Sequence, residues 1–589
     1  MGRHRRPLGN VVLHAPEVLR ALVRADEIWL AALAGVVGIF AGAMVWAMTA
    51  ATQIIHQLAF GITAEEKLSA MTSLPAFNTI VVPIAGGLVM GGVGLLLKWL
   101  HPRHAVDPIE ANALFGGRMS LNDSLIVVAQ TIISNGAGAS IGLEAGYTQI
   151  GAAIASRFGR SFRLRRSDMR LIVGCGAAGA IAAAFNAPLT GAFYAFELVI
   201  GTYTLATFAP VALSSIAAVA VVHAIGRSPF DLNVTVPTHI EAIDYIPLLA
   251  LGMLCALVGI AIMRGVTLTE SLFRRSGVPV WLRPAIGGLA VGLMGLVSPQ
   301  VLSSGHGALG VVVEAPWTVA HVGMLVVLKA TGSAISIGSG FRGGLFFASL
   351  FLGALLGKFY GGVLAAVTTA HAVPVVVCSL VAMSAMAVAI IGGPLTMGFL
   401  ALESTGSLPL TIAVLAACVI SSLTVRRTFG YSFATWRFHL RGEAIRSAVD
   451  IGWMRNLTVG RMMRREVRTV RADTTLSSFR RDFPLGAVQR VVALGDDDSY
   501  AGIVLPAEAH ADPDAAHHLY DVMHHPDTVL LPQMTIKEAI AMFEQAESDA
   551  LVVVDDPAER RVIGLLTEQY ALRRYSEELD RRRRELSGE

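Results

Sequence analysis

The sequence predicts a multi-helical α membrane protein that continues into a soluble α/β region. Of the 589 residues, 54% are hydrophobic and 15% are charged, whereas a soluble domain carries about 25% charged residues. Residues 28–440 form apolar runs separated by short polar loops, and the chain from Arg441 onward has a soluble composition. Two sequence blocks in the apolar region occur twice, which indicates repeated halves.

The apolar region is long enough for well over ten membrane helices, at about 20–25 residues for each helix and its loop. Several runs contain Gly or Pro. Broken helices are tolerated at membrane depth only where the backbone is buried in protein or lines a wet cavity. The runs begin near Ile28, Ile80, Leu125, Leu171, Ile246, Ile286, Val322, Leu350, Val373 and Leu410.

Basic clusters predict the orientation, because basic loops face the cytoplasm. They lie in the N-terminal segment 1–27 and at Arg160–Arg170, Arg274–Arg275 and Arg426–Arg441. We therefore expect a membrane domain over 28–440 with both chain ends in the cytoplasm. A linker is expected over 441–455.

Composition and motifs exclude several classes of function. The 46 Lys and Arg nearly balance the 43 Asp and Glu, so no large basic face is available for nucleic acid. The GxSxG, HExxH and paired-aspartate patterns of intramembrane enzymes are absent. Neither a disulfide nor a metal site is expected, because the cysteines stand singly in apolar runs. They are Cys175, Cys255, Cys378 and Cys418.

The internal repeat is the most informative feature. The block AAAFNAPLTGAFYAFE ends at Glu197 and the block AVAIIGGPLTMGFLALE ends at Glu403, and in both a Pro precedes the Glu by nine residues. Upstream of each block, a glycine-rich stretch contains Ser-Ile-Gly, at Ser140 and at Ser336. Two glycine-rich breaks and two Pro-initiated helices indicate duplicated halves that meet at a central site.

The glycine-rich breaks have the sequence that an anion site needs. A helix N-terminus presents unpaired N–H groups and about half a positive charge. In SIGLEAG and GFRGGLFF, glycines let the chain turn and let an ion approach the backbone, and an apolar helix follows. Several such N-termini directed at the membrane midplane would hold an anion weakly enough for it to leave.

Three acids stand out within the apolar runs, where acids are functional candidates because burying them is costly. Glu144 lies in a glycine-flanked break, so its carboxylate is expected to occupy an anion position and to vacate it when protonated. The alternative is a first-turn capping carboxylate with no gating role. For Glu197 and Glu403, bracing of the fold and participation in ion or proton movement both stay open.

Four blocks resemble the signature segments of the CLC family of chloride channels and proton-coupled chloride antiporters. They are GLEAGYTQIG (142–151), AAAFNAPLTGAFYAFE (182–197), SGFRGGLFFASLFLGALLG (339–357) and FGYS (429–432). The resemblance implies a CLC-like fold with two inverted-topology repeats. It also implies a homodimer in a bacterial inner membrane, with one anion pathway in each subunit, chloride as the transported ion and no catalysis.

The family pattern implies roles for particular residues. Glu144 matches the gating glutamate. Leu345 and Phe346, which follow Gly344, match the helix-start residues whose amides hold the central anion. Tyr431 matches the tyrosine whose hydroxyl contacts that anion from the cytoplasmic side.

The chain departs from the family pattern on the anion side. The family's serine-bearing segment falls near residues 104–112, where Val106 or Asp107 takes the serine position. The basic residue of the glutamate motif is Leu143 here. Arg342 either restores that positive charge or faces water as a loop arginine. Preference among chloride, nitrate, bromide and fluoride stays open.

The proton side departs too. The family's antiporters commonly carry an inner glutamate directly after the position of Glu197, and here that residue is Leu198. One step along a helix rotates a side chain by about 100°, so Glu197 cannot replace it. We expect weak or absent proton coupling, with a proton-coupled chloride or fluoride antiporter as the alternative. A regulated cation channel is a further class, disfavoured by the few acids in the apolar runs.

The soluble region holds two similar segments, 456–510 and 519–576, before a charged tail over 577–589. Each has a short strand, a helix that begins at a threonine and two β-branched strands. The two threonines are Thr475 and Thr535.

These segments resemble a tandem pair of CBS domains, which often bind adenine nucleotides through a Thr or Ser followed by Asp. Here Thr567 is followed by Glu568, so the ribose-binding Asp is missing. We therefore favour a dimerisation role and no bound cofactor. A histidine cluster in the loops is expected to be solvated rather than to bind metal. It consists of His517, His518, His524 and His525.

Overall fold

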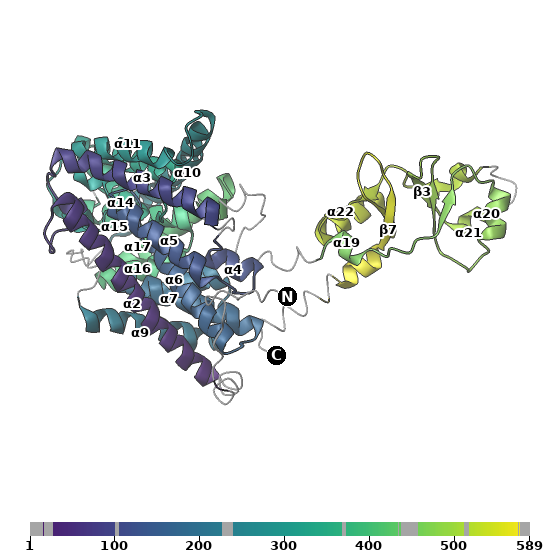
Figure 1. Cartoon of the computed structure of the whole chain (residues 1–589), viewed down its shortest axis with the longest axis horizontal. Helices are drawn as coiled ribbons and strands as arrows, with labels where there is room; N and C mark the ends of the chain where they lie inside the picture. The colour runs from purple at the N-terminus through teal and green to yellow at the C-terminus, as the bar shows by residue number, and fades with distance from the viewer. Residues whose placement is uncertain are drawn as a thin grey trace, which may run out of the picture. The chain divides into compact units, whose positions relative to one another are not determined.

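The computed structural model describes Pro16 and residues 27–100, 105–226, 240–367, 373–430, 432–433, 435–436, 457–511, 518–574 and 577. The chain forms two compact units, Met1–Asp450 and Ile451–Glu589. In the described residues the first unit is helical, and the named strands belong to the second (Figure 1).

The first unit is a multi-helical membrane domain, as predicted. Eight of the described helices are long and apolar enough to cross a membrane. α7, α14 and α15 are buried along most of their length and form the centre of the core. The helices are α2 (Glu27–Phe60), α3 (Ala76–Leu100), α4 (Pro108–Leu114), α5 (Leu121–Gly136), α6 (Glu144–Ser161), α7 (Arg166–Phe185), α8 (Pro188–Tyr194), α9 (Leu205–Ile225), α10 (Tyr245–Arg275), α11 (Arg283–Val297), α12 (Ala308–Glu314), α13 (Val319–Ser339), α14 (Phe346–Val367), α15 (Val375–Ile391), α16 (Pro394–Thr405) and α17 (Leu408–Thr428).

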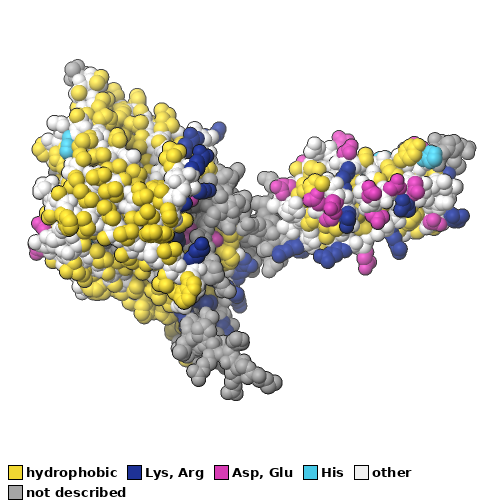
Figure 2. Space-filling model, turned by 45° about the horizontal axis from the view of Figure 1, so that its top comes forward, with side chains coloured by type: hydrophobic (Ala, Val, Ile, Leu, Met, Phe, Trp, Pro, Cys, Tyr) yellow, Lys and Arg dark blue, Asp and Glu magenta, His cyan; other side chains and the backbone are white. Residues whose placement is uncertain are grey.

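The surface of this unit suits a bilayer. A broad face is covered by hydrophobic side chains, and Lys and Arg gather along one edge of it (Figure 2). Three helices carry arginines in their last turn, namely α6, α10 and α17. α2 has 34 residues and is about 51 Å long at 1.5 Å per residue. Because a hydrocarbon core is about 30 Å thick, this helix is long enough to cross it with some tilt.

The two Pro-initiated helices of the repeat brace each other. The carboxylate of Glu197 accepts hydrogen bonds from the backbone N–H groups of Leu395 (3.0 Å) and Thr396 (2.8 Å), and from the Thr396 hydroxyl (2.6 Å). The acid near the end of each repeated block therefore binds the first turn of the other block's helix.

Glu403 mirrors this arrangement. Its carboxylate accepts from the N–H groups of Leu189 (2.8 Å) and Thr190 (2.8 Å), and from the Thr190 hydroxyl (2.7 Å). An anionic group at a helix N-terminus is favoured by both the free N–H groups and the helix dipole. The repeat thus carries a reciprocal pair of caps.

The two copies differ in one respect. α8 continues into a π-helical turn over Ala195–Ile200 that contains Glu197, whereas α16 stays α-helical through Glu403. π-turns occur mostly as single bulges inside helices, and often at functional sites. The first copy is therefore locally wider around Glu197 and Leu198.

The second unit contains two segments of the same topology. In the first, β1 (Thr469–Arg471) pairs in parallel with β2 (Val491–Leu494), which pairs antiparallel with β3 (Tyr500–Val504) and leaves β4 (Met523–His524) at the edge. In the second, β5 (Val529–Leu530), β6 (Ala550–Val554) and β7 (Val562–Thr567) repeat the parallel and antiparallel pairs.

One helix joins the parallel strands of each segment, α20 (Leu476–Asp482) and α22 (Ile536–Ala546). Thr535 caps α22 through a capping box with Glu538. Thr475 holds the N-cap position of α20, but its hydroxyl pairs with Ser477. The remaining short helices are α19 (Val459–Met462) and α21 (Pro506–Ala509).

Replacing Glu403 with Ala should lower the thermal unfolding midpoint of the purified protein. The N–H of Thr190, a buried residue, would lose its acceptor, and an unsatisfied buried donor costs about 1–3 kcal/mol. Glu270→Ala is the control, because the ion pair of Glu270 with Arg274 is exposed on both sides and such pairs contribute little. Equal midpoints for the two variants would contradict the bracing role.

Candidate functional site

The two glycine-rich breaks meet inside the membrane unit. Gly142 and Gly344 exchange two backbone hydrogen bonds, of 2.8 and 3.0 Å, in an antiparallel bridge. Beside it, the Ser336 hydroxyl accepts the Ser140 N–H at 3.0 Å, and the Ser333 hydroxyl donates to the Ser140 carbonyl at 2.8 Å. The bridge brings the first residues of α6 and α14 to one place.

Glu144 is the first residue of α6 and lies over this bridge. Its side chain is buried, and neither carboxyl oxygen has a hydrogen-bond partner. Oε2 lies 1.9 Å from where a Cβ at Gly142 would stand and 3.2 Å from the corresponding point at Gly344. The backbone N–H of Phe347, in the first turn of α14, is directed at this carboxyl but falls short of hydrogen-bond geometry.

The start of α14 is packed by aromatic rings. Leu345 and Phe346 are both buried. The Phe346 ring lies 4.8 Å from that of Phe185 and 6.0 Å from that of Tyr194, measured between centroids. These contacts fix the direction of the α14 N-terminus. Gly344, which has no side chain, leaves the backbone just before this helix uncovered.

Tyr194 is a site residue that the sequence analysis missed. It comes from α8, stacks on Phe346 and faces Thr148, Glu144 and Asp107. A buried tyrosine hydroxyl needs a polar partner, so a lone Tyr in the apolar block 182–197 was the available signal. In the sequence, the repeat draws attention to Pro188 and Glu197 of this block and not to Tyr194.

Asp107 directly precedes α4. Its carboxylate accepts the Glu110 N–H at 2.9 Å and so caps this helix. The Val106 carbonyl accepts from the Gln149 side chain at 2.9 Å. The predicted anion contacts at these two positions thus have local structural roles, and the Asp107 carboxylate is held by its own helix.

Tyr431 lies outside the described residues. Its neighbours Gly430 and Ser432 line a cavity of about 240 Å³, together with Glu197 and Leu198. Arg426 and Thr435 also line it. The structure therefore places Leu198 beside Glu197 in the wall of a cavity with both apolar and polar lining residues.

Arg342 lies in the loop before α14. Its backbone N–H donates to the Ser134 hydroxyl at 3.0 Å, and the residue lines a separate cavity of about 620 Å³ with Lys98, Glu270 and Arg283. The role of Arg342 near Glu144 stays a prediction.

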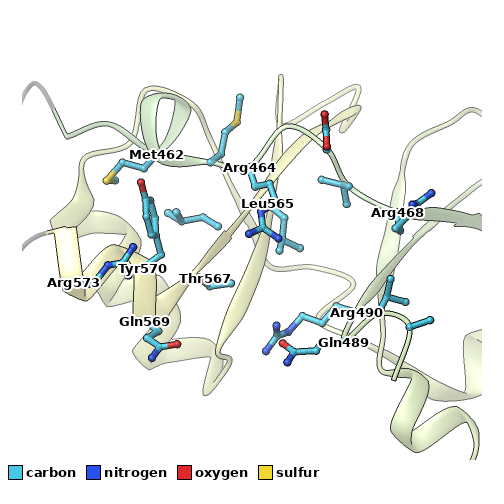
Figure 3. Close-up of a pocket in the computed structure, with 16 residues that line it drawn as sticks. Met462, Arg464, Arg468, Gln489, Arg490, Leu565, Thr567, Gln569, Tyr570 and Arg573 are labelled. Carbon is cyan, nitrogen blue, oxygen red and sulfur yellow. The ribbon is translucent and has the colours of Figure 1, made fainter. Parts of the chain in front are cut away.

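The soluble unit contains a pocket of about 810 Å³ in which Thr567 is a wall residue (Figure 3). Four arginines and one acid, Glu466, line it. This charge balance suits a phosphate-bearing ligand, and Tyr570 offers an aromatic face. The arginines are Arg464, Arg468, Arg490 and Arg573. The expectation of no bound nucleotide at Thr567 stays a prediction.

Comparison with known proteins bears on both units. The profile of the family described as voltage gated chloride channel matches residues 86–426, and the CBS domain profile matches residues 519–577. A ClcB-like chloride channel protein of Ralstonia nicotianae is 33% identical over 409 residues, which cover 67% of this chain and 94% of that protein. The ClC-type chloride channel ClcB of Salmonella typhimurium is 28% identical over 405 residues, covering 67% of this chain and 95% of the relative.

Solved structures share the fold. A slow cyanobacterial Cl⁻/H⁺ antiporter gives a TM-score of 0.61 at 20% identity and covers 70% of this chain and 97% of its own. A eukaryotic CLC transporter gives 0.59 at 16% identity, over 94% of this chain and 98% of its own. The chain therefore belongs to the voltage-gated chloride channel, or CLC, family of membrane channels and transporters, whose members are not enzymes.

Proposed function

We propose that this protein passes chloride or a similar small anion across the membrane, and that Glu144 is its gate. One observation carries the proposal. A buried carboxyl with no hydrogen-bond partner lies over the Gly142–Gly344 bridge, between the N-termini of α6 and α14. A buried unpaired carboxylate is costly. We therefore expect the Glu144 carboxyl to leave this position and an anion to take its place.

The gate follows from what surrounds the carboxyl. In the charged form it takes the place of an anion in front of the Phe347 N–H and the positive end of the α14 dipole. Protonation removes that attraction, and the side chain can then leave the position to a chloride ion. The N–H of Glu144 itself is also directed at the carboxyl, so the pH dependence of anion efflux is the measurement that separates a gate from a cap.

Proton coupling is proposed to be weak or absent. Leu198 lines the 240 Å³ cavity where a proton would enter, and it has no group to carry one. The adjacent Glu197 is bound to three donors of α16. The neighbouring acid is therefore committed to holding the fold.

Proton-coupled chloride or fluoride antiport is the second candidate, and Tyr194 favours it. This residue faces both Glu144 and Asp107, so it supplies a polar connection through an otherwise apolar core. Similar folds include a Cl⁻/H⁺ antiporter and, at a TM-score of 0.54 and 22% identity, a CLC-type fluoride/proton antiporter.

The proposed location is a bacterial inner membrane, with the arginine-bearing ends of α6, α10 and α17 and both chain termini in the cytoplasm.

We propose a homodimer with one pathway in each subunit. Exposed apolar side chains on α9 and α17, such as Leu205 and Leu408, offer a surface for it. Single-molecule photobleaching of labelled protein in nanodiscs should show two steps for each particle, and one step would contradict it.

Glu144→Gln should remove the pH dependence of chloride efflux from proteoliposomes. Efflux through the parent should rise as the pH falls from about 7.5 to about 4.5, because protonation neutralises the carboxylate. The variant should give a constant efflux, at least threefold above the parent at neutral pH. An unchanged pH profile would support a cap, and potassium efflux in place of chloride efflux would indicate a cation channel.

Gly142→Ala should open the pathway without altering Glu144 itself. The three nearest atoms to the added Cβ all belong to the Glu144 carboxyl group, so the flexible side chain must move and chloride efflux at neutral pH should rise. Gly92→Ala is the matched control, because a Cβ there meets nothing within 4 Å. Equal efflux from the two variants would place Glu144 outside the pathway.

A chloride gradient across proteoliposomes should drive little or no uphill proton movement, because Leu198 replaces an acid. A fluorescent pH indicator inside the vesicles measures this. Leu198→Glu is the matched variant, and it should increase proton movement for each chloride. Uphill pumping by the parent at a fixed chloride-to-proton ratio would contradict the proposal and establish the antiporter.

A further inference from the structure

The cavity of about 620 Å³ that Arg342 lines lies between α3, α10, α11 and the end of α13. It is here called the interfacial groove. Sites for small organic ligands have volumes of about 300–1,000 Å³, so the groove is large enough for one. Its walls include Leu95, Val280 and Trp281, whose side chains are 52%, 72% and 41% exposed. The groove is therefore accessible from outside the membrane unit.

One wall of the groove is formed by a helix that borders lipid. α3 lies side by side with α11 (Figure 1), and only six of its 25 residues are buried. Its exposed side chains include Val81, Leu88, Val89 and Leu96. An apolar surface of this extent marks contact with a membrane or with another protein. In a membrane domain it gives acyl chains direct access to the groove.

The groove lies at the level where the helices end. Lys98 is in the last turn of α3, and Arg283 is the first residue of α11. α10 ends with two arginines, and Trp281 stands in the loop that follows it. Tryptophan and basic residues gather where a bilayer meets water. With the orientation proposed above, this level is the cytoplasmic interface, where anionic headgroups lie.

The groove carries an excess of positive charge. Among the described residues, its basic side chains are Lys98, Arg283 and Arg342, and its one acid is Glu270. Glu270 is already paired with Arg274 at 3.2 Å. In the part of the chain that the structure describes, neither Lys98 nor Arg283 has a carboxylate within ion-pair distance. The groove therefore attracts an anionic group.

Arg283 is positioned to bind such a group. Its Nε donates to the Val278 carbonyl at 3.0 Å, which holds the plane of the guanidinium. Its two terminal amino groups make no hydrogen bond to any described residue. Arginine N–H groups bind phosphate oxygens in pairs. This side chain is therefore available to a phosphate group that enters the groove.

The same groove has room for an acyl chain. Gly94 lines it, and a Cβ added there would meet nothing within 4 Å. Met90, Leu95 and Val266 add apolar walls. Cationic groups and apolar walls thus line one cavity, which matches an amphipathic ligand with an anionic headgroup.

We infer that the interfacial groove binds an anionic phospholipid of the cytoplasmic leaflet, with its phosphate at Lys98 and Arg283 and an acyl chain over Gly94. The inference goes beyond the proposed function, because lipid binding does not depend on which ion the protein moves.

The groove also borders the loop that leads to the anion cradle. Residues 340–343 line it, and Gly344, which follows them, forms the bridge with Gly142. A lipid in the groove would therefore contact the backbone directly before the bridge.

Native mass spectrometry of the full-length protein in detergent measures lipid binding directly. The parent should bind dioleoyl phosphatidylglycerol about fivefold more tightly than dioleoyl phosphatidylcholine, which has the same chains and no net charge. Lys98→Gln and Arg283→Gln should each weaken phosphatidylglycerol binding about fivefold and leave phosphatidylcholine binding unchanged. Arg275→Gln is the matched control, because Arg275 is exposed in the last turn of α10 but does not line the groove.

Gly94→Phe tests the acyl part of the groove. Its ring should fill the space beside α3 and weaken phosphatidylglycerol binding about fivefold, as the loss of a buried chain segment of a few methylenes would. Gly92→Phe is the matched control. A Cβ at Gly92 also meets nothing within 4 Å, but this residue does not line the groove.

Phosphatidylglycerol binding that is the same in the parent, Lys98→Gln, Arg283→Gln and Gly94→Phe overturns the inference. Displacement of the lipid by an equal concentration of glycerol 3-phosphate also overturns it, because the site would then take a free phosphate ester. The thermal midpoint of each variant is measured beside its binding. If Arg283→Gln unfolds, Lys98→Gln and Gly94→Phe decide the question, since both positions are exposed.

Discussion

The pair of backbone hydrogen bonds between Gly142 and Gly344 is the constraint on which the rest of the membrane unit depends. It joins two breaks that lie far apart in the sequence and brings the starts of α6 and α14 together. Glycine at position 142 leaves the space that the Glu144 carboxyl occupies, because a Cβ there would lie 1.9 Å from Oε2 of that group. The bridge therefore brings the two helix starts together and also leaves space for the Glu144 carboxyl beside them.

The duplicated sequence also joins the Pro-initiated helices α8 and α16. Each repeat contributes an acid that binds the first turn of the other repeat's Pro-initiated helix, through Glu197 and Glu403. These carboxylates accept hydrogen bonds from N–H groups that would have no acceptor in lipid. Three glutamates of one fold thus have different surroundings. Glu197 and Glu403 accept hydrogen bonds from helix N-termini, whereas neither carboxyl oxygen of Glu144 has a hydrogen-bond partner.

Much of this could be predicted from the sequence, because the relevant signals are local. The repeat, the glycine breaks and the apolar runs are patterns of spacing and composition, and the membrane fold class that they predict is confirmed. The family, which the resemblance of four sequence blocks implied, is confirmed as well. The meeting of Gly142 with Gly344 could not be read from spacing, since Ser-Ile-Gly aligns Gly142 with Gly338 instead. The π-helical turn at Ala195–Ile200 also has no local sequence signal.

Side-chain directions were beyond prediction for a physical reason. Whether a charge points into a pathway depends on packing from distant segments. For Arg342 the sequence left open a charge near Glu144 or a loop arginine that faces water, and the structure shows that it lines the 620 Å³ cavity. The buried Lys329 is a single lysine in the apolar run of α13, and only the fold shows that its ammonium reaches the loop beside the gate.

The central claim is that backbone amides at the start of α14 hold an anion in the place that Glu144 otherwise fills. Anomalous diffraction from crystals grown in bromide tests it most directly, with the parent and Glu144→Gln compared. The account predicts bromide in front of the Phe347 amide in the variant, at the position of the parent's carboxyl. Crystals of the variant without bromide at that amide would contradict it.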